Sequence, residues 1–189
     1  MKGYESLILE NLKKVFKKSD SEIKIKAFGC DCVIKPDGIF LSGKKETGAI
    51  GVIISLYAQN HFEREPVFEP FISIKDIPDS KPYYSAFHEY AERPLIPYVD
   101  KIYEKRELIQ NRLGHFEKGL LFEDSGDFSF VLFPLPKIAL KYIFYFEDEE
   151  FPASVTCLFS NNAPSFLPTD VLSDLAEYTG KKILELIKE

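Results

Sequence analysis

The segment from residue 119 to residue 159 constrains the fold most, because it consists of apolar runs separated by very short polar turns. The runs "GLLF", "FSFVLFPLP", "KIALKYIFYF" and "PASVTCLF" follow one another with only a few turn-forming residues between them. Connections this short join antiparallel strands, whereas parallel strands need crossovers of a dozen or more residues. The sequence therefore predicts an antiparallel sheet in the C-terminal half.

Helical patterns lie mainly before and after this block. An amphipathic pattern covers residues 1–18, and a long apolar stretch that suits a buried helix covers residues 45–60. Residues 81–114 suggest helices that are broken near Pro94 or Pro97. A closing helix is predicted over residues 167–189. Gly114 is a plausible helix stop. This order is typical of an α+β fold, not of alternating βαβ units, with the sheet packed against helices that include both terminal ones.

Shorter strands are expected elsewhere. "SEIKIKAF" alternates with period two, "DCVIKPDGIFL" predicts two strands about a Pro-Asp-Gly turn, and "EPFISIKDIP" suggests one more short strand. A length of 189 residues with no linker-like stretch predicts a single domain over residues 1–189.

Composition excludes several classes of partner. The net charge of −6 argues against a nucleic-acid binder, which needs a dense basic surface. The longest apolar stretch, "GAIGVIISLYA", is shorter than the ~20 residues that cross a bilayer, so no membrane association is expected. Three cysteines do not make a disulfide framework, and we expect a cytoplasmic protein with reduced thiols. The oligomeric state is left open.

The acidic cluster "EDEE" between the last two strands admits two interpretations. It is either an exposed charged turn, which hydrates easily and discourages sheet-edge association, or a site. In the second case Asp148 and Glu150 point to the same side of extended chain, where two carboxylates could bind Ca²⁺ or Mg²⁺ or divide acid and base roles. Asp148 and Glu150 are therefore the metal-binding candidates, although no calcium-loop motif surrounds them.

His88 is the remaining catalytic candidate among the histidines. It shares a helix face with Glu92 at a spacing of four residues, which suits two metal ligands, an oriented base or an ordinary packing pair. The catalytic hypothesis joins His88, Asp148, Glu150 and Asp170, and it requires the closing helix to begin beside the acidic turn. No hydrolase motif supports a nucleophile.

Two further motifs suggest chemistry only weakly. Cys30 and Cys32 in "GCDC" have one residue between them, and the chain has too few cysteines for a metal or iron–sulfur cluster of the usual kind. Core packing is therefore the expectation, and a metal or redox role is the alternative. "GIFLSGKK" has the glycine–lysine spacing of a phosphate loop, but its apolar residues suit a strand. We therefore expect no cofactor.

Five stretches of the sequence, in the order in which they occur, resemble the family catalogued as domain of unknown function 3786. They are "YYSAF", "RPLIPY", "DFSFVLFPLPKIAL", "DEEFPASVTCLF" and "FLPTDVL". The resemblance covers roughly residues 48–184, leaving the N-terminal helix and short strands of residues 1–47 outside it. It implies an origin in anaerobic bacteria or archaea. Some relatives carry a separate iron–sulfur domain, whose cysteine motif is missing here.

Two functions follow as hypotheses. The first is an accessory or protein-interaction module of the cytoplasm, in anaerobic redox or methyl-transfer metabolism, with an unknown protein partner. The alternative is a small metal-dependent enzyme or ligand binder that uses the carboxylate cluster. Whether the protein is an enzyme stays open at this point.

Overall fold

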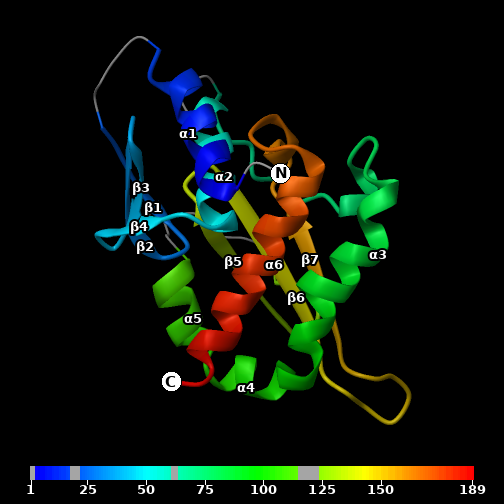
Figure 1. Cartoon of the computed structure of the whole chain (residues 1–189). Helices are drawn as coiled ribbons and strands as arrows, with labels where there is room; N and C mark the ends of the chain where they lie inside the picture. The colour runs from blue at the N-terminus through cyan, green and yellow to red at the C-terminus, as the bar shows by residue number, and fades with distance from the viewer. Residues whose placement is uncertain (1–2, 18–21, 61–63, 115–123) are drawn as a thin grey trace.

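The N-terminal part of the chain forms a helix and a four-stranded antiparallel sheet (Figure 1). A computed structural model describes residues 3–17, 22–60, 64–114 and 124–189. Helix α1 (Tyr4–Val15) precedes the strands β1 (Ile23–Ala27), β2 (Cys30–Lys35), β3 (Gly38–Leu41) and β4 (Lys44–Glu46). The predicted hairpin about Pro36 is present.

Strand β4 was not predicted. Ser42 and Gly43 both adopt positive φ values, which a two-residue hairpin turn requires. The residues with phosphate-loop spacing therefore lie in the β3–β4 hairpin, where their backbone groups pair across the strands.

Helix α2 (Ala49–Asn60) is the predicted buried helix, and it packs against α1. Its many β-branched residues are tolerated because tertiary burial outweighs their lower helix propensity. The helices approach closely at Gly51, where a Cβ atom would lie 2.6 Å from the Ile8 Cδ1 atom. A buried hydrogen bond of 3.0 Å from Asn11 to Ser55 also joins them.

The stretch predicted as broken helices is a chain of short helical segments. They are η2 (Lys81–Tyr83), α3 (Tyr84–Phe87), the π-helical turn η3 (His88–Glu92), the 3₁₀ helix η4 (Arg93–Tyr98), α4 (Val99–Glu104) and α5 (Arg106–Leu113). The expected break is confirmed, because Pro94 and Pro97 both lie in η4 and neither can donate the backbone hydrogen bond of an α-helix. Gly114 follows α5, as predicted.

The C-terminal half contains the predicted antiparallel sheet, with strands β5 (Phe128–Leu135), β6 (Ile138–Tyr145) and β7 (Ser154–Phe159) in that order. The strand predicted at "GLLF" lies outside the described residues. Of the strand predicted within residues 69–78, only a bridge between Ile72 and Phe159 forms. The chain then turns into η1 (Ile74–Asp76), because the side chains of Ser73 and Asp76 cap its first turn reciprocally.

Helix α6 (Thr169–Leu186) follows η5 (Ala163–Ser165) and crosses one face of the C-terminal sheet (Figure 1). On this face the Tyr142 hydroxyl donates a 3.3 Å hydrogen bond to the Ala176 carbonyl of α6. The opposite face of the sheet buries a smaller cluster of Val131, Phe133 and Ala139. The two antiparallel sheets with helices at both ends of the chain confirm the α+β class. No helix among the described residues has the length and apolar character needed to cross a membrane.

Candidate functional site

The β6–β7 hairpin carries the acidic cluster at its tip, which extends beyond the sheet in Figure 1. The Asp148 carboxylate accepts hydrogen bonds from the backbone N–H groups of Glu150 (2.8 Å) and Phe151 (2.7 Å). The Asp148 N–H in turn donates to the Phe151 carbonyl at 3.0 Å. Asp148 therefore organises the turn, in the manner typical of aspartate in loops.

The other three acidic side chains of the tip, Glu147, Glu149 and Glu150, are exposed. None of them makes an ion pair with another described residue. Their charge is hydrated, and this geometry is the one that the charged-turn interpretation predicts.

A hollow of about 250 Å³ lies between the base of this tip and the helical segments η4 and α4. We call it the hairpin groove. Its described lining residues come from two segments distant in sequence: Ile96, Pro97, Val99 and Asp100 on one side, and Phe146, Glu147, Pro152 and Ala153 on the other. Six of these eight residues are apolar, but polar atoms make up about half of the exposed lining, and each side carries one carboxylate.

Two exposed aromatic residues adjoin residues that line the hairpin groove. Phe151, which directly precedes the lining residue Pro152, is 66% exposed. Tyr103 of α4 is also exposed, and its ring packs edge-on against the lining residue Phe146 at a centroid distance of 5.5 Å. Leaving a phenylalanine ring in water is unfavourable, because its apolar surface stays unburied.

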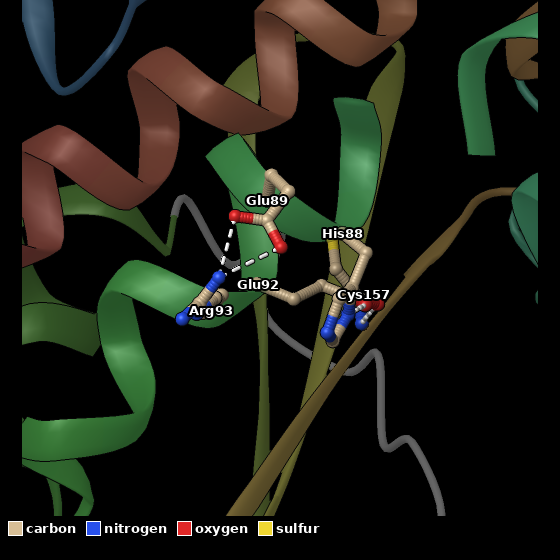
Figure 2. Close-up of polar contacts among 5 residues, drawn as sticks. All are labelled: His88, Glu89, Glu92, Arg93 and Cys157. Carbon is tan, nitrogen blue, oxygen red and sulfur yellow. Dashed lines mark hydrogen bonds and ion pairs between the residues drawn. The ribbon is translucent and has the colours of Figure 1, made fainter. Parts of the chain in front are cut away.

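A second cluster joins the π-helical turn to the sheet (Figure 2). The His88 Nδ1 atom lies 2.9 Å from the Glu92 Oε2 atom, which confirms that the two residues share a helix face. The other carboxylate oxygen, Oε1, accepts a 2.9 Å hydrogen bond from the backbone N–H of Cys157 in β7. Beside them Glu89 and Arg93 form a separate exposed pair at 2.8 Å.

Glu92 serves as a cap for the edge of β7. The backbone N–H groups of β7 that point away from β6 need hydrogen-bond acceptors. The Phe159 N–H donates to the Ile72 carbonyl, and the Cys157 N–H donates to the Glu92 carboxylate. The Glu92 side chain is only 14% exposed, whereas His88 is 56% exposed and contacts its outer oxygen. This role could not be predicted from the sequence, because Glu92 and Cys157 are 65 positions apart and no local pattern joins them.

The three cysteines are free thiols, and two of them, Cys32 and Cys157, are buried. Burial, with a smaller effect from Cys30, raises the pKa of the Cys32 thiol to about 12. Burial, followed by the nearby Glu92 carboxylate, also raises the pKa of Cys157 well above its usual value, although the neighbouring Tyr142 hydroxyl opposes this. Cys30 is half-buried. Since the thiolate is the reactive form, Cys32 and Cys157 are poorly suited to nucleophilic or redox chemistry.

The difference in burial predicts that the three thiols react at different rates. At about pH 8, close to the ordinary thiol pKa, we expect one thiol of the native protein to react quickly with a disulfide reagent and the other two slowly. A Cys30→Ser variant should lose the fast phase, whereas denatured protein should show all three thiols. A fast phase that survives in Cys30→Ser would contradict this arrangement.

The residues of the catalytic hypothesis lie in different places. Asp170 is in the first turn of α6, which begins at the end of the C-terminal sheet away from the acidic tip (Figure 1). Its neighbour there is Asp174, whose pKa is raised by partial burial, then by Glu177 and Asp170. His88 pairs with Glu92, and Asp148 with its own turn. Within the described part of the chain, no group of three or more His, Cys, Asp or Glu side chains could hold a metal ion.

Comparison with known proteins identifies a family. The family described as "Domain of unknown function (DUF3786)" matches residues 6–182. The match therefore includes most of the N-terminal helix and the whole first sheet, which lie outside the span of the motifs quoted above. No curated protein and no solved structure matches the chain.

Proposed function

The chain belongs to the DUF3786 family, and we propose that this protein is a cytoplasmic protein-interaction module whose partner docks in the hairpin groove. The observation that carries the proposal is the exposed Phe151, which adjoins in sequence the groove-lining residue Pro152. The predicted setting in anaerobic redox or methyl-transfer metabolism rests on the family resemblance and stays a prediction.

The size of the groove favours a protein partner over a small molecule. Pockets for small ligands typically enclose about 300–1,000 Å³, and the hollow of about 250 Å³ lies below that range. It is large enough for one or two side chains of a partner. Anchoring side chains that fill such hollows supply much of the affinity at protein interfaces.

Both sides of the groove are held in place before a partner arrives. Pro97 and Pro152 restrict the backbone on either side, and Asp148 fixes the turn that carries Phe151. A surface organised in this way loses less conformational entropy on binding.

The side chains that could take part in catalysis are poorly placed for it, and this favours a binding role. Cys32 and Cys157 are buried with raised pKa values, and the Glu92 carboxylate beside His88 already caps the sheet edge. The alternative, a metal-dependent enzyme built on the acidic cluster, has no ligand set in its favour among the residues described.

Site-specific photocrosslinking tests the proposal. The aromatic photoreactive amino acid p-benzoylphenylalanine replaces Phe151 in one variant and Tyr4 in the control, because Tyr4 is similarly exposed (58%) but lies on α1, away from the hairpin tip (Figure 1). In a lysate of the source organism we expect a discrete crosslinked species from position 151 and none of the same mass from position 4. Equal crosslinking at the two positions, or none at position 151, would contradict the proposal.

A further inference from the structure

Each side of the hairpin groove carries negative charge within its own segment of the chain. The segment 146–153 contains four acidic residues and no lysine or arginine, and the segment 96–100 contains one acidic residue and no basic one. The acidic residues are Asp100, Glu147, Asp148, Glu149 and Glu150. Two of these carboxylates, Asp100 and Glu147, line the groove, and the other three lie on the hairpin tip beyond it.

Cations also follow closely in sequence on the helical side of the groove. Lys101 is exposed on α4. Arg106 donates a 2.8 Å hydrogen bond to the Tyr103 carbonyl, and its guanidinium lies 4.2 Å from the centre of the Tyr103 ring. Glu147, Glu149 and Glu150 are exposed, and none of them makes an ion pair with a described residue.

We infer that the partner segment is basic, with lysine or arginine residues flanking one apolar side chain. This inference rests on the proposed function and specifies the partner of the same groove. The apolar side chain would enter the hollow against Ile96, Val99 and Phe146, while the flanking cations face the carboxylates of the tip. Acidic and basic surfaces brought together in this way accelerate association and select the partner, whereas an acidic segment would be repelled.

The exposed aromatics suit the same partner. Tyr103 already holds the guanidinium of Arg106 against its ring, which demonstrates cation–π contact beside the groove. The exposed ring of Phe151 offers a further face to a lysine or arginine of the partner.

The test is an NMR titration of the ¹⁵N-labelled full chain with the blocked peptide KKLKK. We expect saturable shifts confined to residues 96–100 and 146–153, with affinity in the millimolar range, on the order of the weakest specific complexes. The peptide EELEE lacks the basic residues, and KKSKK lacks the apolar one. Each should bind at least about fivefold more weakly than KKLKK. Raising the salt to about 0.5 M should weaken the binding of KKLKK, since exposed charges are then screened.

A charge variant supplies the matched control. Glu147→Gln/Glu149→Gln/Glu150→Gln leaves Asp148 and its turn intact, and it should weaken KKLKK at least about fivefold because several exposed ion pairs are lost together. Glu69→Gln/Asp79→Asn/Glu189→Gln changes the net charge equally at exposed positions elsewhere and should bind as the wild type does.

The outcomes separate the two proposals. Binding of EELEE as tight as that of KKLKK, shifts spread over other surfaces, or no shifts at all would overturn the basic partner. Crosslinking from position 151 would then still support an interaction role, with a partner of different chemistry. If crosslinking from position 151 also fails, the proposed function itself is wrong.

Discussion

Replacing Phe144 with alanine is expected to lower the free energy of unfolding by about 3–5 kcal/mol, the range found for large-to-small changes in a packed core. Phe144 is fully buried in β6. Its ring stacks on that of Phe128 at 4.5 Å and contacts that of Phe130 at 5.1 Å. The substitution removes these contacts and leaves a cavity at the base of the hairpin that carries the groove. Urea denaturation followed by circular dichroism measures the effect.

Phe151→Ala is the control for this prediction, because it makes the same chemical change on the same hairpin at an exposed position. Surface substitutions usually change stability by less than about 0.5 kcal/mol, so we expect this variant to unfold as the wild type does. It should lose partner binding, however. A loss of stability as large as that of Phe144→Ala would mean that Phe151 is part of the core and would remove the main argument for a docking surface.

Replacing Glu92 with alanine is expected to cost about 1.5–3 kcal/mol, the contribution of a hydrogen bond to a charged group. The carboxylate is the acceptor for the Cys157 N–H, which is buried in the edge strand. Without it that N–H loses its partner, and exchange of the Cys157 amide hydrogen with deuterium should accelerate more than exchange in the centre of β6. Denaturation and hydrogen exchange together measure the effect.

Two variants distinguish the hydrogen bond from Cys157 to Glu92 from an ordinary surface ion pair. Glu92→Gln keeps a side-chain oxygen that can accept from Cys157 and should recover most of the stability. Glu89→Ala removes only the exposed pair with Arg93, which is worth about 0–1 kcal/mol. Should Glu92→Ala be no worse than Glu89→Ala, the edge-cap role of Glu92 would be refuted.

The elements that depend on local pattern were predicted from sequence. The strands at residues 128–135, 138–145 and 154–159 follow from apolar runs with short turns, and Pro94 and Pro97 locate the break in the helical stretch. Strand β4 was missed because Ser42–Gly43 is a weak turn signal compared with Pro36–Gly38. The strand expected around Ile72 reduces to one bridge because the Ser73 cap starts a helical turn.

The candidate site could be predicted only in part. The exposed position of the acidic turn and the contact between His88 and Glu92 follow from spacing along the chain. The groove could not be predicted, because Ile96 and Phe146 come from segments that meet only in the folded protein. The same holds for Glu92, whose acceptor role depends on the placement of a π-helical turn against the edge of β7.

Competition in the photocrosslinking experiment tests the central claim, that the hairpin groove is a docking surface. The crosslinked species from position 151 should disappear when excess unlabelled wild-type protein is added, because the wild type occupies the partner. The same excess of a Phe151→Ser variant should leave the species in place. If both proteins compete equally, or neither does, the partner does not recognise this surface and the account is wrong.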